Sequence, residues 1–449
     1  MSNLNTEPNY ELDGFGKNIE QVYTVDQGFA TKRGLRNDDG TGVLVGVTGI
    51  GSVQGYYLED GERVPTEGQL YYRGISVLDI IKNHRESNTF GYEEVAYLLL
   101  FGKLPTKEEY ERFNAILSRN RALPDSFTED VLLRAPSRNI MNQLSRGIEA
   151  LYSYDQIDDD TSPENLLRQS IELIARFPSI VANAYAVKRH RFYGKSLYIH
   201  NPKPGLSLSE NFLRMVRPDK TYTDEEAKLL DIMLILHAEH GGGNNSAFVC
   251  RAVSSSGTDT YSAIAAAVNS LKGPLHGGAN AKVMEMIGYI KRDLPDYSDE
   301  NKLREYLSKL LDGTAGDGSG KIYGLGHAVY TISDPRAVSI RESARALAEK
   351  YGRLEELRLL ENIECIGKEL ICERKKLALP ICANVDLYSG FVYDMLGIPE
   401  DLYTPLFAIA RVTGWCAHRM EELISCKRIM RPAYKAAVKK LPYTPLDER

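Results

Sequence analysis

The chain has 449 residues, 43% of them hydrophobic and 26% charged, and this ordinary composition argues against disorder as the main state. A net charge of −6 and a pI near 5.9 argue against general nucleic-acid binding, although a local cluster of arginines can still bind a small anion. Runs of about eighteen apolar residues, a secretory signal and CxxC pairs are absent from the sequence, so we expect a cytoplasmic protein with reduced cysteines and no membrane span.

Strand character is confined to a stretch near the N-terminus. Residues 41–74 are rich in glycine and in β-branched and aromatic residues, which predicts a few short strands in a small sheet. The next segment has an apolar face and then a Gly–Lys–Leu–Pro–Thr break, in which Pro105 precedes a new helix and Thr106 is its cap. We therefore expect a small β element followed by two helices that are joined by a tight turn.

Apolar periodicity predicts helices through most of the remaining chain, and so the fold class is all-α with a small N-terminal β element. The expected helical segments are 128–152, 165–188, 208–216, 223–239, 260–271, 279–291, 337–351, 355–373 and 406–425. A polar connector is expected over 293–302. Breaks in composition at 273–280 and 384–400 are the best candidates for domain boundaries, and internal repeats are absent from the sequence.

Four of the eight histidines, His237, His240, His276 and His327, lie near glycines, and histidine is the side chain best suited to proton transfer near neutral pH. Segment 234–246 predicts a helix that ends at three glycines, with His240 in its last turn. Three interpretations stay open here. The histidines can cap a helix end, His240 can bind a substrate, or His237 and His240 can bind a metal with Glu239 nearby, although the spacing differs from HExxH.

His276 lies in a turn bounded by glycine and proline, directly before an expected helix N-terminus. The positive end of that helix disfavours the imidazolium form, and a neutral imidazole there can donate a hydrogen bond to a developing enolate oxygen. A purely structural turn histidine is the alternative. In segment 313–337, the run GDGSGK differs from a phosphate-binding loop, because Ala315 replaces the first required glycine and Ile322 follows the lysine.

Three further segments carry charged side chains of interest. GLGH presents His327 in a loop that allows close approach, and the following DPR caps a helix and offers Arg336 as a carboxylate partner. Asp386 precedes an expected helix as a general base or as a turn aspartate. Arg411 in FAIARVTG and Arg431 in RIMRPAY taken alone favour surface positions or ion pairs.

Taken in order, HAEHGGGNNS, GPLHGGAN, GLGHAVYxxxDPRA, NVDLYSG and FAIARxxGWxAH resemble the citrate synthase family, as do QLYYRG and EEVAYLLLFGKLPT nearer the N-terminus. The resemblance covers nearly the whole chain except about the first forty residues. It implies a two-domain, almost entirely helical fold and a homodimer. The implied large domain is 1–278 with an N-terminal extension, the small domain that closes over the active site is 279–391, and 392–449 returns to the large domain and forms a C-terminal arm.

The resemblance also implies roles for individual residues. Asp386 resembles the base that deprotonates the acetyl methyl, His276 the neutral donor to the thioester oxygen, and His327 the group that polarises the oxaloacetate carbonyl. The implied oxaloacetate ligands are His240, Arg336, Arg411 and Arg431, of which Arg431 comes from the dimer partner. Asn244 and Ser246 are implied supporting residues, of which Ser246 orients His276, and the implied CoA-binding residues are Lys321, Gly324, Gly326, Lys375 and Lys376.

Two positions depart from the family pattern, because many relatives have proline where Tyr323 stands and a basic residue where Thr331 stands. The implied function is that of a Si-type citrate synthase of the tricarboxylic acid cycle, an acyltransferase that uses acetyl-CoA as a substrate and needs no metal or other cofactor. The alternatives are a 2-methylcitrate synthase that uses propionyl-CoA, a metal hydrolase that uses His237 and His240, and a noncatalytic CoA-binding homologue. One methylene changes the free energy of binding in a pocket by only about 1–3 kcal/mol, so the sequence does not separate the first two.

Overall fold

The computed structural model describes residues 32, 35–37, 41–60, 62–377, 379–426, 428–434, 436, 438 and 440–449. Its contacts divide the chain into two units. One unit comprises Met1–Val47 and Arg431–Arg449, in which the described residues include an antiparallel bridge between Arg36 and Gly42 and the short helix η3 (Leu446–Glu448). The other unit, Thr48–Met430, contains the remaining elements and every predicted site residue except Arg431.

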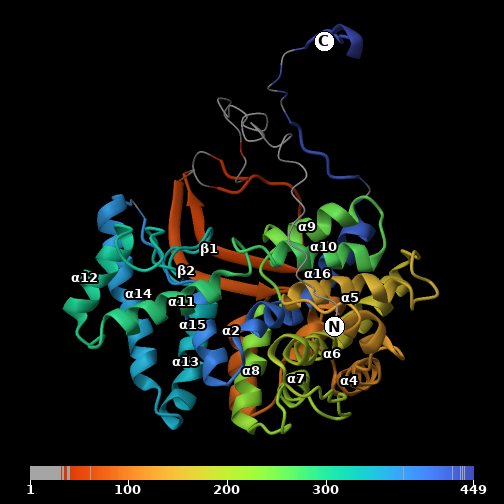
Figure 1. The fold of residues 1–449 in the computed structure, drawn as a ribbon, viewed down its shortest axis with the longest axis horizontal. Helices are drawn as coiled ribbons and strands as arrows, with labels where there is room; N and C mark the ends of the chain where they lie inside the picture. Colours follow the sequence, from red (N-terminus) through yellow and green to blue (C-terminus); the bar gives the residue numbers. More distant parts are fainter. Residues whose placement is uncertain are drawn as a thin grey trace. The chain divides into compact units, whose positions relative to one another are not determined.

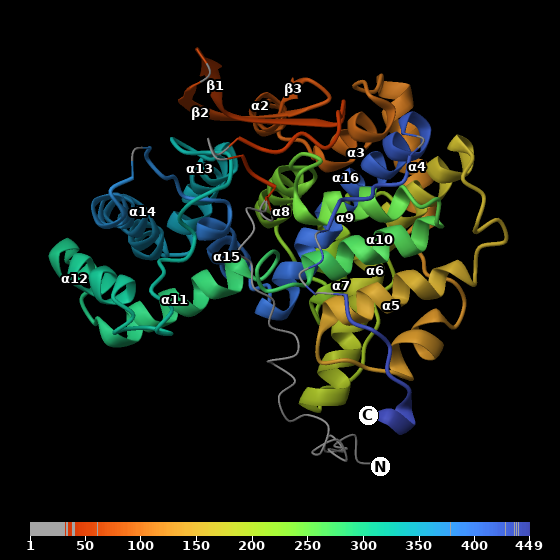
Figure 2. The same ribbon diagram turned by 90° about the horizontal axis from the view of Figure 1, so that it is seen from above.

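The predicted N-terminal β element is confirmed as a three-stranded antiparallel sheet in the order β1-β2-β3. Figure 1 shows the hairpin of β1 and β2, and Figure 2 also labels β3. Its strands are β1 (Gly51–Glu59), β2 (Glu62–Tyr72) and β3 (Ile75–Ser76). A Cβ at Gly55 would lie 2.7 Å from the main-chain oxygen of Val329, and one at Gly68 would lie 2.2 Å from that of Ser333. The glycines therefore allow the hairpin backbone to lie directly against the segment that follows His327.

The prediction of an all-α fold is confirmed, since 58% of the residues that the structure describes are helical and 6% lie in strands. The first group of helices is α2 (Val77–Ser87), α3 (Tyr92–Phe101), α4 (Lys107–Asn120), η1 (Thr128–Leu133), α5 (Ile140–Tyr152), α6 (Pro163–Tyr193), α7 (Leu208–Val216), α8 (Asp224–His237), α9 (Asn245–Ser254) and α10 (Thr260–Leu271). The rest are α11 (Ala279–Asp293), α12 (Glu300–Leu311), α13 (Pro335–Lys350), α14 (Leu354–Lys375), α15 (Asp386–Met395), η2 (Glu400–Leu402) and α16 (Tyr403–Ser425). No helix among these described residues is long and apolar enough to span a membrane.

Helix α16 is the centre of the packing, because it contacts α3, α5, α6, α8, α9 and α10. It is buried nearly all round from Leu406 to Ala417, as expected of a helix inside a core rather than one with a solvated face. Helices α11 to α15 pack on one another and gather on one side of this unit (Figure 2). That 279–391 forms a closing domain stays a prediction.

Local signals placed several helix ends correctly. Thr106 forms a capping box with Glu109 at the start of α4, and α10 spans the predicted residues 260–271. Other predictions differ from the structure. The 293–302 connector is shorter than expected because Asp299 caps a helix that begins at Glu300, and segment 128–152 divides into η1 and α5 around a Pro–Ser turn.

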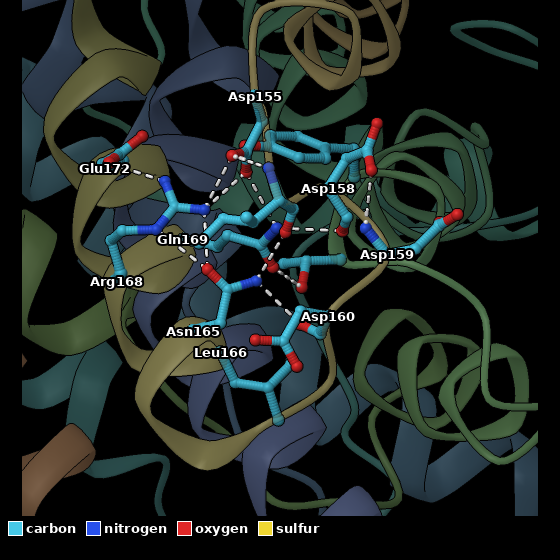
Figure 3. Close-up of polar contacts among 12 residues, drawn as sticks. Asp155, Asp158, Asp159, Asp160, Asn165, Leu166, Arg168, Gln169 and Glu172 are labelled. Atoms are coloured by element: carbon cyan, nitrogen blue, oxygen red, sulfur yellow. Dashed lines mark hydrogen bonds and ion pairs between the residues drawn. The ribbon is translucent and has the colours of Figure 1, made fainter.

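A polar network around Asp155 fastens the loop after α5 to two helices (Figure 3). The carboxylate accepts hydrogen bonds from Arg168 at 2.7 Å and Gln169 at 2.9 Å in α6, and from the hydroxyl of Tyr261 in α10 at 2.8 Å. Burial raises the pKa of Asp155, but these donors outweigh it and lower the pKa to about 2. The acidic run 158–160 therefore belongs to a loop that the hydrogen bonds of the Asp155 carboxylate hold in place.

Candidate active site

The turn after α8 carries His240. The helix ends at His237, so the prediction that His240 lies in the last helical turn is wrong. The end is set by Tyr72 of β2, whose hydroxyl lies 2.8 Å from the main-chain oxygen of Ile235 and 3.1 Å from that of Glu239. His240 is buried, and its Nε2 has no hydrogen-bond partner among the described residues. Burial, with the charge of Arg336, lowers its pKa well below the ordinary value, so the ring is neutral.

The loop that carries His327 faces this turn, since the ring centroids of His240 and His327 lie 5.1 Å apart. Nδ1 of His327 accepts hydrogen bonds from the main-chain N–H groups of Val329 and Tyr330, each at 3.1 Å. A nitrogen that accepts cannot carry the proton of a neutral ring, so the proton of neutral His327 is on Nε2. This tautomer presents Nε2–H as a donor.

The His327 loop is bonded to the segment that leads into Asp386. Gly326 donates to the main-chain oxygen of Cys382 at 2.8 Å, and the side chain of Asn384 donates to the oxygen of Gly326 at 3.0 Å. Asn384 also accepts from the main-chain N–H of Asp386 at 3.0 Å. The motifs GLGH and NVDLYSG, about sixty residues apart in sequence, are therefore one structural piece.

Asp386 is the first residue of α15 and is half-buried, so it begins the helix instead of lying in a loop before it. Burial raises its pKa to about 6, although the positive charge of Arg336 opposes this shift. A carboxylate with a raised pKa is a stronger base than an ordinary one and is still ionised at pH 7. Its position and basicity fit the predicted general base.

His276 lies in the predicted turn before α11 and is half-buried. Its Nε2 lies 3.0 Å from Oγ of Ser246, which accepts from the indole N–H of Trp415 at 3.1 Å and lies 2.9 Å from Oδ1 of Asn244. Burial and then the charge of Arg411 lower the pKa of His276 to about 4. The imidazole is therefore neutral, as the turn and the helix end predicted, although the causes are burial and an arginine.

The two buried arginines of the site are bound differently. Arg336 pairs with Asp334, with Nη2 to Oδ2 at 2.7 Å and Nε to Oδ1 at 3.0 Å. Arg411 is fully buried, so the prediction of a surface position is wrong for it. Its Nε donates to the main-chain oxygen of His237 at 2.6 Å, and within the described part of the chain neither Nη1 nor Nη2 has a hydrogen-bond partner. Buried guanidinium nitrogens without partners are costly, and a bound carboxylate would satisfy them.

The CoA-binding residues implied by the resemblance are less closely grouped. Gly324 and Gly326 have positive φ angles of 85° and 95°, and space around Gly326 is open. Lys321 is exposed, and so are Lys375 and Lys376 at the end of α14. The departure at Tyr323 has a structural consequence, because its hydroxyl donates to Asp317 at 2.6 Å and braces the glycine-rich loop.

The metal interpretation of His237 and His240 is not supported by the geometry. Nδ1 of His237 donates to the main-chain oxygen of Met233 at 2.7 Å, and the ring packs against Phe407 at a centroid distance of 4.8 Å. In the described ranges, no three His, Cys, Asp or Glu side chains converge as metal ligands. Arg431 is exposed and belongs to the other unit of the chain, so its role stays a prediction.

Sequence reasoning missed the groups that hold the site together, notably Tyr72, Trp415 and His418. One signal was available for two of them. Arg411, Trp415 and His418 are spaced four and three residues apart, which places them on one face of a helix. Because Arg411 on that face was assigned to the substrate, Trp415 and His418 were candidates for residues that hold the site in place.

Neutral histidines, a carboxylate of raised pKa and a buried arginine whose Nη groups meet no described acceptor, set in a helical fold, are typical of an enzyme that runs acid–base chemistry on an anion. The family model described as citrate synthase, C-terminal domain, matches residues 39–433. The chain belongs to the citrate synthase family and is a transferase.

Named relatives show how far the similarity extends. The citrate synthase of Deinococcus radiodurans is 37% identical over 367 residues, which are 82% of this chain and 89% of that protein. The 2-methylcitrate synthase of Shewanella oneidensis is 35% identical over 81% of this chain and 87% of its own. The fold resembles citrate synthase from Pyrobaculum aerophilum, with a TM-score of 0.74, 30% identity and coverage of 91% and 94%. It also resembles that of Thermoplasma acidophilum in a complex with carboxymethyl coenzyme A and oxaloacetate, with a TM-score of 0.76, 26% identity and coverage of 94% and 100%.

Proposed function

We propose that the protein is a Si-type citrate synthase that condenses acetyl-CoA with oxaloacetate and hydrolyses citryl-CoA to citrate and CoA. The observation that carries this proposal is a set of three buried nitrogens, Nη1 and Nη2 of Arg411 and Nε2 of His240, that have no hydrogen-bond partner among the described residues. These groups suit a small dicarboxylate with a carbonyl. Arg336 adds a second positive charge to the site, and the charges of Arg336 and Arg411 both lower the pKa of His240.

In the proposed reaction, Asp386 takes a proton from the acetyl methyl while His276 donates a hydrogen bond to the thioester oxygen. Pairing a base with a donor spreads the developing charge of the enol and lowers the barrier. The enol carbon then attacks the ketone carbon of oxaloacetate, and Nε2–H of His327 protonates the ketone oxygen. Water cleaves the resulting citryl thioester. The tautomer of His327 and the raised pKa of Asp386 support these assignments.

We assign the adenine end of acetyl-CoA to the loop around Lys321, Gly324 and Gly326, with Lys375 and Lys376 as weaker candidates. Open space beside Gly326 leaves room for a ligand to approach the backbone closely there. Closure of residues 279–391 over the site would exclude water and prevent premature thioester hydrolysis. The chemistry needs no metal or redox cofactor, because the donors and bases are all side chains.

We also propose a cytoplasmic homodimer in which Arg431 reaches the partner's site. Mixed dimers test this. A dimer of one Arg431→Ala and one Arg411→Ala subunit would contain one site with both defects and one with neither. We expect subunit exchange between the two inactive variants to restore up to half of the wild-type activity per exchanged dimer. Failure to recover activity, with exchange demonstrated by mass spectrometry, would contradict a shared site.

The alternative is a 2-methylcitrate synthase, favoured by the similarity to the enzyme of that name from Shewanella oneidensis. The deciding experiment supplies oxaloacetate with acetyl-CoA or propionyl-CoA and follows thiol release with a chromogenic reagent. Faster release with acetyl-CoA supports the proposed citrate synthase, and faster release with propionyl-CoA supports the alternative. Absence of oxaloacetate-dependent release from either, by folded protein, would contradict both.

A further inference from the structure

A buried chain of polar side chains lies behind the turn that carries His240. It runs from Arg251 of α9 to His418 of α16 and then to Glu239, the residue before His240. His418 and Glu239 are both completely buried, and Nε2 of His418 lies 2.9 Å from Oε1 of Glu239. No step of the proposed reaction uses these three residues, yet burying them carries a cost in desolvation.

Hydrogen-bond directions assign the proton of His418. Nδ1 accepts from Nε of Arg251 at 3.0 Å and lies 2.7 Å from its Nη2, and a guanidinium can only donate. The ring is therefore neutral, with its proton on Nε2, and it donates that proton to Glu239. The charge of Arg251 is balanced by Glu421 and Glu422, the latter at 2.9 Å.

The backbone on both sides of His240 is fixed by hydrogen bonds of Glu239. Its Oε1 also accepts from the main-chain N–H of Gly241, the residue after His240. Its own main-chain N–H and oxygen both lie within hydrogen-bond distance of the Tyr72 hydroxyl, at 3.3 and 3.1 Å. The backbone on each side of His240 is thus fixed by bonds that end on Glu239.

The space for this carboxylate is made by two glycines. A Cβ at Gly51 would lie 2.9 Å from Cγ of Glu239, and one at Gly414 would lie 2.4 Å from Oε2. Oε2 itself has no hydrogen-bond partner among the residues that the structure describes. Burial raises the pKa of Glu239, while the hydrogen bonds from His418 and Gly241 and the charge of Arg411 lower it. The two groups that bond Oε1 both donate, which favours the ionised carboxylate, and its charge balances Arg411 without occupying the Nη groups.

We propose that Glu239, held by His418, is a positioning residue for the dicarboxylate substrate, because it fixes His240 and leaves both Nη groups of Arg411 available. This inference rests on the proposed function, which supplies oxaloacetate as the ligand of His240 and Arg411. The residue acts through His240 and Arg411, and we expect the loss of its support to weaken oxaloacetate binding more than any later step.

Two substitutions at His418 separate positioning from general stability. The amide of Asn matches the Nδ1 side of the imidazole, so His418→Asn keeps an acceptor for Arg251 and loses the donor to Glu239. The longer amide of Gln reaches the Nε2 position, so His418→Gln keeps a donor to Glu239. His84→Asn is the matched control, because Nδ1 of His84 bonds Thr89 at 2.8 Å and its Nε2 bonds Glu94 at 2.8 Å far along the chain.

The measurements are the Kd of oxaloacetate by calorimetry, the KM of each substrate and the Tm. We expect His418→Asn to raise the Kd and KM for oxaloacetate at least tenfold, with the KM for acyl-CoA at saturating oxaloacetate unchanged. His418→Gln should stay within about threefold of wild type, and His84→Asn should change only the Tm.

The positioning role would be overturned if both His418 substitutions weakened oxaloacetate binding equally, or if His418→Asn kept the wild-type Kd. The proposed function would still stand in either case, provided that the wild-type protein turns over both substrates. Wild-type protein that neither binds oxaloacetate nor releases thiol would overturn the proposed function and this inference with it.

Discussion

Nε of Arg411 donates a 2.6 Å hydrogen bond to the main-chain oxygen of His237, at the point where α8 ends. The bond uses the inner nitrogen of the guanidinium and so directs the two outer nitrogens away from the helix end. The ring of Phe407, one turn earlier on α16, lies 4.7 Å below the guanidinium carbon. Two helices and one aromatic ring therefore orient a fork whose two terminal nitrogens have no protein acceptor among the described residues.

Arg411→Lys should abolish tight binding of oxaloacetate. A lysine nitrogen cannot bond the oxygen of His237 and a carboxylate bidentately at once, and removing one partner of a buried charge pair costs about 2–5 kcal/mol. We expect the Kd to rise about 100-fold or more by calorimetry. Arg419→Lys is the control, because Arg419 is buried on the same helix but its three nitrogens bond Thr260, Ser254 and Thr258. That variant should lose stability and keep its affinity. Wild-type affinity in Arg411→Lys would contradict the assignment.

Asp386→Asn should remove turnover and make the protein more stable. A half-buried carboxylate whose pKa is raised from 3.8 to about 6 binds its proton more tightly when folded, so its contribution to stability falls as pH rises between about 4 and 6. The neutral amide avoids this cost, which is up to about 3 kcal/mol at pH 7. Urea unfolding should show the gain at pH 7 and little difference at pH 4. A variant that lost activity and stability together at pH 7 would indicate that the carboxylate is needed for folding.

The pH profile of kcat/KM should have an acid limb near pH 6. Asp386 acts as a base only when ionised, so activity should fall tenfold per pH unit below its raised pKa of about 6. His276, with a pKa lowered to about 4, stays neutral through the same range and adds no limb between pH 5 and 8. Stopped assays with acetyl-CoA and oxaloacetate across pH 5 to 8 would measure this. A limb at or above pH 7 would point to a different base.

Predictions from local sequence patterns failed at two residues of the site, His240 and Arg411. Local patterns predicted the turn at His276 and the cap at Thr106, because glycine, proline and capping side chains act on their own neighbours. They misplaced His240, because the end of α8 depends on Tyr72 from a strand more than 160 residues away. They also misjudged Arg411, since no local pattern reports that α16 is buried on all sides. Only the family resemblance, which rests on the order of the motifs, predicted that these residues, distant in sequence, belong to one site.

Asp155→Asn should destabilise the fold and leave the active site intact. The pKa of Asp155 is lowered from 3.8 to about 2, so the ionised form stabilises the folded protein above pH 4 and this contribution is lost as pH falls through 2. The shift corresponds to about 2 kcal/mol. We expect urea unfolding at pH 7 to show a loss of that size, with both KM values unchanged. Asp159→Asn, in the same loop but exposed, is the control and should change the free energy of unfolding by less than about 0.5 kcal/mol. An Asp155 variant as stable as wild type would contradict the anchoring role of the network.

The hydroxyl of Ser246 has one proton and two neighbours that can take it, Oδ1 of Asn244 at 2.9 Å and Nε2 of His276 at 3.0 Å. If the proton goes to His276, the neutral ring carries its own proton on Nδ1 and can donate to the thioester oxygen. If it goes to residue 244, His276 must carry its proton on Nε2, and Nδ1 cannot donate. An asparagine side chain serves either arrangement, because turning its amide offers Ser246 a donor instead of an acceptor.

Asn244→Asp should therefore reduce kcat with little effect on oxaloacetate binding. A carboxylate only accepts, so it takes the Ser246 proton permanently and forces the unproductive tautomer of His276. Losing one donor to a developing oxyanion costs about 10²–10³ in kcat, and we expect that loss at pH 8 with the Kd of oxaloacetate within about threefold of wild type. Asn245→Asp adds the same charge one residue along, at an exposed position that bonds Ser270, and should retain most of its kcat. Near-normal turnover by Asn244→Asp would show that the tautomer of His276 is set elsewhere.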